Sequence, residues 1–210
     1  MTPDLPLLER WLTAWSLSRG LPLPVHEQGG LSVEVGWPEQ RRRFVFADAG
    51  AALQACAAGI TEPFVHLKAP VAPAAMQQAL PPGWELEELR YLMSCRVAMS
   101  GAVAVPSGYS LNIEPAHGAQ LIRLIDASGT TAASGKLVLH GATAVFDQIE
   151  THEQHRRKGL ASVVMRELDR LAEQAKVSER LLVATEAGRP LYLALGWDVL
   201  APYSTFLRPH

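Results

Sequence analysis

Three consecutive cations, Arg156, Arg157 and Lys158, stand directly before Gly159 and a long amphipathic pattern. The amino end of a helix carries a partial positive charge, so three cations there are unfavourable unless an anion is bound. Free backbone N–H groups, the helix dipole and a glycine without a side chain together form a cradle for phosphate oxygens. The sequence predicts a phosphate site at this helix start. A solvated basic turn with an incidental glycine is the alternative.

The elements around these cations form a strand–helix–strand unit. An apolar strand covers residues 142–149, a helix with one apolar face covers 156–176, and residues 181–184 form a short apolar run. Such a run is typical of a strand buried on both faces. A right-handed βαβ connection places its ligand crevice at the carboxyl ends of the strands. The cations follow the end of the first strand, so spacing and topology point to the same site.

The remaining elements alternate strands and helices in both halves of the chain. The first half predicts a helix over 5–17, a hairpin over 31–46, helices near 50–58 and 73–80, and strands at 64–67 and 84–93. The second half adds strands at 109–113, 121–125, 136–140 and 198–207 and a helix near 188–195. The shared order suggests an internal duplication divided as 1–99 and 100–210, with a linker at 106–108. Two unrelated α+β pieces are the alternative.

Two motifs in the second half resemble those of a known family. Arg156-x-x-Gly159-x-Ala161 is similar to the acetyl-CoA signature (Arg/Gln)-x-x-Gly-x-(Gly/Ala) of the GNAT N-acetyltransferase superfamily. The segment from Leu191 to Trp197 is similar to its Leu-Tyr-x-x-Leu-Gly-(Phe/Trp) motif. The resemblance covers about residues 109–207. It implies an α+β fold with a GNAT-like central mixed sheet flanked by helices, and a degenerate, cofactor-free GNAT-like first half.

The resemblance also implies acetyl-CoA as co-substrate, with no metal ion. Backbone groups of the strand end would pair with the pantetheine arm, and amides of the following loop would hold the pyrophosphate. Thr185 stands where the family often has an asparagine that contacts the cofactor, so its contribution is open. The implied cofactor-binding residues are Ile149, Glu150, Thr151, Arg156, Arg157, Lys158, Gly159, Leu160, Ala161 and Thr185.

The catalytic candidates are Tyr192 and Asp147. Aminolysis of a thioester releases a thiolate, and a phenol beside the sulfur can protonate it as a general acid. Period-two alternation places Asp147 and Ile149 on one face of an otherwise apolar strand. Asp147 is therefore the candidate base or amine anchor, with a structural hydrogen-bonding role as the alternative. Glu150 is the competing base.

The resemblance, together with these residues, implies an N-acetyltransferase that moves an acetyl group to a primary amine of a small molecule or amino acid by direct attack in a ternary complex. One alternative is a non-catalytic acyl-CoA-binding module that regulates a partner. Another is transfer onto a protein N-terminus or lysine. No acyl-accepting cysteine lies near the motifs, which disfavours a covalent acyl-enzyme.

Composition narrows the setting. The 210 residues carry a formal charge of −2, which disfavours nucleic acid as a partner, and no apolar run reaches the roughly 18 residues of a membrane span. The N-terminus lacks a basic region typical of a secretory signal, and two cysteines are too few for a disulfide scaffold. We expect a cytoplasmic monomer or homodimer without membrane contact. His152 and His155 are interpreted as solvated. The run Arg41–Arg43 is interpreted as a solvated edge or turn, with contact to the 3′-phosphate of the cofactor or to the substrate as the alternative.

Overall fold

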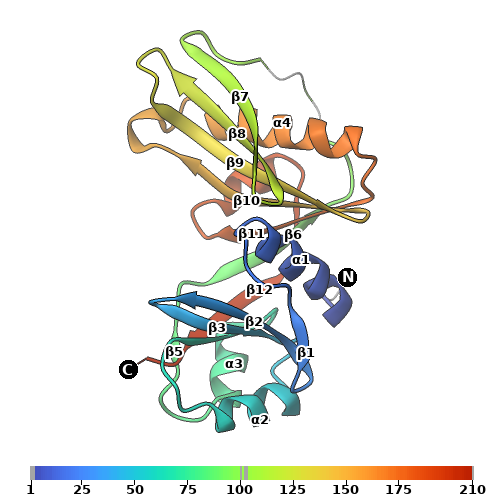
Figure 1. Ribbon diagram of the computed structural model, residues 1–210, viewed down its shortest axis with the longest axis vertical. Helices are drawn as coiled ribbons and strands as arrows, with labels where there is room; N and C mark the ends of the chain where they lie inside the picture. Colours follow the sequence, from blue (N-terminus) through green and yellow to red (C-terminus); the bar gives the residue numbers. More distant parts are fainter. Residues whose placement is uncertain (1–2, 100, 102–103, 210) are drawn as a thin grey trace.

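The computed structural model describes residues 3–99, 101 and 104–209 and consists of two lobes joined at a narrow waist (Figure 1). A mixed sheet runs through both lobes in the strand order β1-β2-β3-β4-β12-β6-β11-β10-β9-β8-β7, and β5 pairs with β12 beside this path. The predicted fold class, a central mixed sheet flanked by helices, is confirmed. Within the described ranges, no helix is long and apolar enough to cross a membrane.

Each half of the chain contributes strands and helices in a similar order. The first half contains α1 (Leu5–Leu17), β1 (Val25–Glu27), β2 (Gly30–Trp37), β3 (Gln40–Val45), α2 (Ala51–Gly59), β4 (Val65–Ala69), α3 (Pro73–Ala79), β5 (Glu85–Leu86) and β6 (Arg90–Cys95). The second half contains β7 (Tyr109–Ala116), β8 (Ala119–Asp126), β9 (Thr131–His140), β10 (Thr143–Thr151), the 3₁₀ turn η1 (Glu153–His155), α4 (Leu160–Gln174), β11 (Glu179–Thr185), α5 (Arg189–Ala194) and β12 (Asp198–Leu207).

The last strand of each half lies at the waist, against strands of the other half. β12 lies between β4 and β6, and β6 lies between β12 and β11. On each side of this central pair stands a parallel strand pair whose connection is a helix, β3-α2-β4 in one lobe and β10-α4-β11 in the other. This twofold arrangement favours an internal duplication over two unrelated pieces. The division at residue 99/100 stays a prediction, and residues 100, 102 and 103 lie outside the described ranges.

Helix α1 lies at the waist and packs against strands of both lobes, β2 on one side and β9 and β10 on the other. Asp4 caps it, because the Leu7 N–H donates to Asp4 Oδ1 at 2.9 Å. Its apolar stripe is buried, with Trp11 and Trp15 nearly inaccessible to solvent. Ser18, the polar residue that follows the helix, is also fully buried. α1 therefore carries polar groups into the interior between the lobes.

The other helices cover the opposite face of the sheet. α2 and α3 bury a cluster around Phe44, Leu53 and Leu67 in the first lobe. α4 buries a larger cluster around Phe146, Val164 and Trp197 in the second lobe. Trp197, the last residue of the second motif, is 1% exposed and belongs to this core. The strands at the centre of the molecule are thus covered on both faces, which holds the site residues on rigid elements.

Several predicted element boundaries are wrong. β9, for example, begins at Thr131 rather than at 136. α4 begins at Leu160 rather than at 156, because Gly159 adopts a left-handed conformation and forms the N-cap. The three cations therefore belong to the preceding loop and do not oppose the dipole from within the first turn. The strand predicted over 84–93 is split into β5 and β6, since residues 87–89 leave the strand conformation.

Candidate active site

The loop between η1 and α4 presents backbone donors that have no partner. Arg157 (φ +61°) and Gly159 (φ +74°) both lie in the left-handed region. No acceptor among the described residues lies within hydrogen-bond distance of the backbone N–H groups of residues 157–161. Consecutive free N–H groups at a helix start are the donor set that phosphate oxygens need. The loop borders a cavity of about 270 Å³ lined by Thr151, His155, Arg156, Arg157, Gly159, Leu160, Ala161, Ser162 and Leu191.

Lys158 and His155 lie on the outer side of this loop, and both contact Tyr109. Lys158 does not line the cavity, and its Nζ donates to the Tyr109 hydroxyl at 3.4 Å. The same hydroxyl lies 2.9 Å from His155 Nδ1, and His155 Nε2 lies 3.3 Å from Asp126 Oδ2. The interpretation of His155 as a solvated histidine is therefore wrong. Its side chain is 13% exposed and ties the loop to β7 and to the β8–β9 turn.

A groove opens where β10 and β11 separate. The two strands pair in parallel only from Thr143 to Val145 on β10, opposite Glu179 to Leu181. Beyond Val145, the edge of β10 that faces β11 makes no ladder hydrogen bonds among the described residues. The groove measures about 430 Å³ and is lined by Arg19, Arg90, Phe146, Asp147, Gln148, Ile149, Glu150, Leu182, Val183, Thr185, Gly188 and Tyr192. It brings five of the predicted site residues together: Asp147, Ile149, Glu150, Thr185 and Tyr192.

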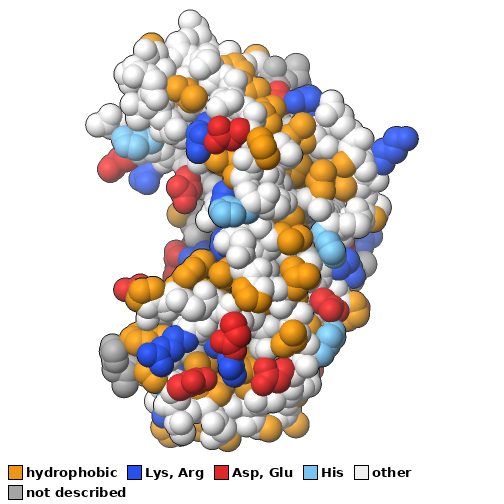
Figure 2. Space-filling view, in the orientation of Figure 1, with side chains coloured by type: hydrophobic (Ala, Val, Ile, Leu, Met, Phe, Trp, Pro, Cys, Tyr) orange, Lys and Arg blue, Asp and Glu red, His pale blue; other side chains and the backbone are white. Residues whose placement is uncertain are grey.

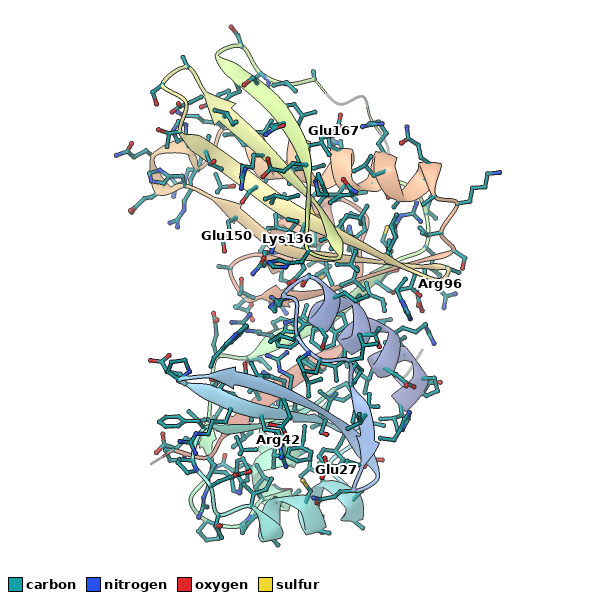
Figure 3. All side chains as sticks on the ribbon, in the orientation of Figure 1. Glu27, Arg42, Arg96, Lys136, Glu150 and Glu167 are labelled. Atoms are coloured by element: carbon teal, nitrogen blue, oxygen red, sulfur yellow. The ribbon has the colours of Figure 1, made fainter. Side chains whose placement is uncertain are left out.

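A bulge in β10 changes which side chains share a face. The register with β9 shifts between Asp147 and Glu150, and Gln148 has a φ of +52°. Ile149 consequently packs with Phe146 in the cluster under α4, whereas Asp147 turns toward α1. The prediction that Asp147 and Ile149 share a face is wrong, because the extra residue breaks the period-two alternation. Exposed Glu150 projects from the lower edge of the upper lobe (Figure 3).

Tyr192 occupies the wall of the groove formed by α5. Its side chain is 7% exposed and makes an edge contact with Trp197, with ring centroids 6.3 Å apart. Its hydroxyl has no hydrogen-bond partner among the described residues. Burial, with a smaller contribution from the charge of Asp147, raises the pKa of Tyr192 to about 12. The phenol therefore stays protonated at neutral pH and can donate a proton into the groove.

Asp147 lies on the opposite wall of the groove and is held by the end of α1. Its carboxylate forms an ion pair with Arg19, whose Nη2 is 3.3 Å from Asp147 Oδ1, and it accepts a hydrogen bond from Ser18 Oγ at 3.0 Å. The Asp147 side chain is 19% exposed. Arg19 was not predicted as a site residue, because the partners are 128 positions apart and α1 alone reads as an ordinary surface helix. A carboxylate fixed in this way is suited to orient a substrate amine.

The structure also places Thr185, His152 and the run Arg41–Arg43. Thr185 lines the groove, but its hydroxyl already accepts the Gly188 N–H at 3.0 Å and so stabilises the turn into α5. His152 is exposed, as expected. Arg43 is 7% exposed, so the interpretation of the run Arg41–Arg43 as wholly solvated is wrong for its last member.

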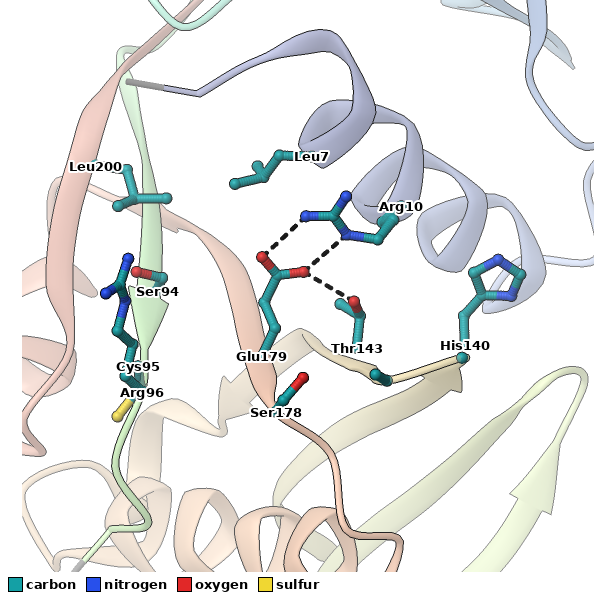
Figure 4. Close-up of a pocket in the computed structure, with 12 residues that line it drawn as sticks. Leu7, Arg10, Ser94, Cys95, Arg96, His140, Thr143, Ser178, Glu179 and Leu200 are labelled. Carbon is teal, nitrogen blue, oxygen red and sulfur yellow. Dashed lines mark hydrogen bonds and ion pairs between the residues drawn. The ribbon is translucent and has the colours of Figure 1, made fainter. Parts of the chain in front are cut away.

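A larger cavity, about 580 Å³, lies at the other ends of the parallel strands (Figure 4). Arg10 Nε donates to Glu179 Oε2 at 2.9 Å, and Thr143 Oγ1 donates to the same oxygen at 2.8 Å. These hydrogen bonds keep the pKa of Glu179 below its usual value although burial opposes them. Arg10, Glu179 and Thr143 thus satisfy one another, and neither Tyr192 nor the loop before α4 lines this cavity.

No family model and no curated protein matches the sequence, whereas solved structures match over most of its length. A GCN5-related N-acetyltransferase from Kribbella flavida has a TM-score of 0.66 and 11% identity, covering 94% of this chain and 93% of that one. A putative GNAT-family acetyltransferase from Novosphingobium aromaticivorans has a TM-score of 0.55 and 19% identity, covering 95% and 96%.

The chain has the GNAT fold. The resemblance based on two motifs is thereby confirmed at the level of the fold. A tandem GNAT protein from the clavulanic acid biosynthesis pathway also matches, with a TM-score of 0.55 and 15% identity over 68% of this chain and 63% of that one. A tandem GNAT protein among the matches agrees with the twofold arrangement of the lobes.

The GNAT groove of this chain fits acetyl-CoA on two observations. The N–H groups of residues 157–161 are free to donate to phosphate oxygens, and Gly159 leaves open space where a side chain would begin. The unpaired edge of β10 leads from this loop to Tyr192. Among the described residues, no cluster of histidine, cysteine, aspartate and glutamate side chains is arranged to hold a metal ion.

Proposed function

We propose that this protein transfers an acetyl group from acetyl-CoA to a primary amine of a small molecule by direct attack in a ternary complex. The supporting observation is that the Tyr192 hydroxyl and the Asp147 carboxylate line one groove, which continues toward a loop of free backbone donors. Acetyl-CoA, when bound, supplies an activated acyl group as a thioester. The chain's own residues hold it, orient the amine and handle the protons.

Binding of the cofactor rests on backbone groups. The amides of residues 157–161 would hold the pyrophosphate, with Arg156 and Arg157 adding positive charge beside the cavity. Ile149, Glu150 and Thr151 would offer the free edge of β10 to the amide groups of the pantetheine arm. Lys158 would not contact the cofactor directly. It would hold the loop in place through its hydrogen bond to Tyr109, which also contacts His155.

Proton handling falls to the two walls of the groove. Tyr192, whose pKa is about 12, keeps its proton until a thiolate forms and then donates it as a general acid. Asp147, held by Arg19 and Ser18, positions the amine and accepts its proton directly or through water. Glu150 is the alternative base at the mouth of the groove.

Neither cysteine is suited to carry a covalent acyl group. Cys56 is 1% exposed in the core under α2, and burial raises the pKa of its thiol to about 11. Cys95 is 2% exposed and donates to the Val97 carbonyl, and burial raises the pKa of its thiol as well. Because the thiolate is the nucleophilic form, direct transfer to the amine is favoured.

A panel of primary amines tests this proposal. Purified protein is incubated with acetyl-CoA and each amine, free thiol is followed with a chromogenic reagent, and products are examined by mass spectrometry. We expect thiol release together with an acetylated amine for at least one class of acceptor. Tight binding of acetyl-CoA without transfer to any small amine, peptide N-terminus or lysine would instead support a binding module.

A further inference from the structure

A second cavity of about 340 Å³ adjoins the groove and extends beneath α1 toward the first lobe. The two spaces share the walls formed by Arg19, Arg90, Asp147, Gln148 and Val183. We name the second cavity the acceptor pocket. Its remaining lining comes from the first half of the chain and from β12: Trp11, Trp15, Trp37, Gln40, Arg43, His66, Lys68, Glu87 and Tyr203.

The acceptor pocket lies on the side of the waist where the molecule is indented. The space-filling view shows this indentation between the lobes at the left (Figure 2), and the turn between β2 and β3 borders it in the same orientation (Figure 1). A neighbouring cavity of about 400 Å³ shares Trp37, Gln40, His66 and Glu87 with the pocket. Together they give a small molecule a route from solvent to the groove.

Polar atoms without partners gather in the acceptor pocket. Four buried side-chain atoms that lack any hydrogen bond in the described part of the chain belong to its lining: Gln40 Nε2, Arg43 Nε, His66 Nδ1 and Tyr203 OH. Each of these residues is at least nine-tenths buried. Leaving a buried donor without an acceptor is costly, so such a cluster is expected where a ligand completes the hydrogen bonds.

Two buried cations in the acceptor pocket have no carboxylate partner. Lys68 is 6% exposed, and its Nζ donates to Thr205 Oγ1 at 2.7 Å. Arg43 donates through Nη2 to Gln40 Oε1 at 3.1 Å and lies 3.6 Å from the ring centroid of Trp15. In the part of the chain that the structure describes, neither is within 4 Å of an acidic group. The nearby acids are engaged elsewhere, Glu87 by His66 and Asp147 by Arg19.

The titration behaviour of these cations agrees with a missing anion. Burial, assisted by the charge of Arg43, lowers the pKa of Lys68 well below its usual value. Burial also lowers the pKa of Arg43 to about 10. In both cases burial outweighs the opposing charge of Glu87, and a bound anion would oppose the shifts further.

We infer that the acceptor pocket binds a carboxylate carried by the same molecule as the acceptor amine. The carboxylate accepts hydrogen bonds from Lys68, Arg43 and their neutral neighbours, and this places the amine at Asp147. The identity of the amine as the acetyl acceptor rests on the proposed function, whereas binding of the carboxylate does not depend on it. The acceptor class is therefore an amino acid or a related small amine that bears an acid group.

A carboxylate suits the acceptor pocket better than a phosphate does. Glu87 and Asp147 line the same space, and their charge would repel a dianion more strongly than a monoanion. Planar carboxylates also match the guanidinium geometry. Trp15 and Trp37, with ring centroids 6.0 Å apart, supply an apolar wall for the body of the molecule.

Matched acceptors test the inference on the intact protein. Free amino acids, their C-terminal amides and O-phosphoethanolamine are compared for acetyl transfer and for binding by calorimetry. We expect the carboxylate forms to be preferred by roughly ten- to hundredfold in kcat/KM over the amides, since a charge-assisted hydrogen bond is lost. Equal use of acids and amides would overturn the inference. A preference for the phosphate compound would show an anion site of another kind and would overturn the choice of carboxylate.

Variants in the acceptor pocket supply the second arm. Lys68→Met and Arg43→Gln should each raise KM for the carboxylate acceptor by about tenfold or more while leaving calorimetric CoA affinity unchanged. Arg42→Gln is the matched control, because Arg42 on the same strand is one-third exposed and pairs with Glu34. It should change neither value. Lys68→Met should also raise the melting temperature, since an unpaired buried cation is removed.

The outcomes separate this inference from the proposed function. A lower melting temperature for Lys68→Met with an unchanged KM would make Lys68 a structural residue and overturn the inference. Lack of transfer to any amine, with carboxylate binding that is lost in Lys68→Met, would refute the proposed function and keep the carboxylate site. Transfer to neutral and acidic amines alike would keep the function and refute the site.

Discussion

Tyr192 is placed by packing rather than by hydrogen bonds. Its ring contacts Trp197 and its edge lies close to Gly188, where an added Cβ would stand 3.2 Å from Cε2. The hydroxyl makes no hydrogen bond within the described residues, so nothing in the chain competes for its proton. The oxygen of Tyr192 therefore adds no hydrogen bond to the fold and stays available for the proton donation proposed above.

Tyr192→Phe should therefore lower kcat and leave CoA affinity almost unchanged. General acid catalysis is worth about 10²–10⁴-fold, and a loss near the lower end is expected because thiolates also take protons from water. Because the pKa of Tyr192 is about 12, the wild-type rate should show no loss of this acid up to about pH 10. Steady-state kinetics and calorimetry measure both effects, with Tyr91→Phe as control. Full turnover by the Phe variant would make Tyr192 structural.

Gly159 acts through its backbone conformation. At φ +74° a side chain is strained wherever it points, although an added Cβ would meet no atom within 4 Å. Gly141, in the turn between β9 and β10, has φ +57° and equally open surroundings. The two glycines therefore share the same intrinsic penalty but differ in their distance from the loop of free amides.

Gly159→Ala and Gly141→Ala should destabilise the protein to a similar extent, about 1–2 kcal/mol each. Only Gly159→Ala should also weaken CoA binding, because the loop must leave the conformation that aligns its amides. Calorimetry with CoA and thermal unfolding separate the two effects. Equal CoA affinities for both variants would contradict the assignment of the loop as the pyrophosphate site.

At the scale of elements, both lobes contain the same strand–loop–helix unit, but the loops of the two units differ in their charges and in their free hydrogen-bond donors. The loop from β10 to α4 holds cations and free donors. Its counterpart from β3 to α2 contains no cation, and the Gly50 N–H there donates to Asp48 Oδ1 at 2.7 Å. The carboxylate of Asp48 thus takes the place that a phosphate oxygen would need. The first lobe has the shape of the unit without its ligand chemistry.

One CoA per chain is the expected stoichiometry, and the single site should belong to the second lobe. Calorimetry on the intact protein gives the number directly. Arg157→Glu should weaken this binding, and more at low salt than at high salt, because part of the attraction is screened. A second site of measurable affinity, or an unchanged affinity in Arg157→Glu, would contradict this prediction.

The sequence predicted local geometry and missed contacts between segments that are distant in the chain. The loop before α4 and the position of Tyr192 on α5 could be predicted, because cations, glycine and motif residues lie within a few positions of the elements that place them. Arg19, Arg43 and Lys68 come to line the groove and the acceptor pocket only when α1 and the first lobe pack against β10 and β12. The sequence held one signal of the acceptor pocket: His66 and Lys68 stand at alternate positions of an otherwise apolar strand, so they point to the same face of the sheet.

At the scale of the whole molecule, each lobe depends on the other because the last strand of each half pairs with strands of the other half. We call these two strands, β6 and β12, the exchanged strands. β6 pairs with β11 and β12, and β12 pairs with β4, β5 and β6. α1 packs against strands of both lobes, on the face of the sheet opposite to α2, α3 and α4. Unfolding of either lobe would leave unpaired strand edges and exposed tryptophans in the other, so the acceptor pocket exists only while both lobes are folded.

The protein should consequently unfold in one cooperative transition, although its sequence suggests two similar halves. Leu53→Ala in the core under α2 should lower the single melting temperature by roughly 5–15 °C, given about 2–5 kcal/mol for such a cavity. Val164→Ala, on the buried face of α4, should shift the same transition by a smaller amount, since fewer methyl groups are lost. Calorimetry tests whether the measured and van't Hoff enthalpies agree. If Leu53→Ala splits the transition, leaving amides of β11 protected against hydrogen exchange while those of β4 exchange, the lobes are independent and the exchanged strands do not couple them.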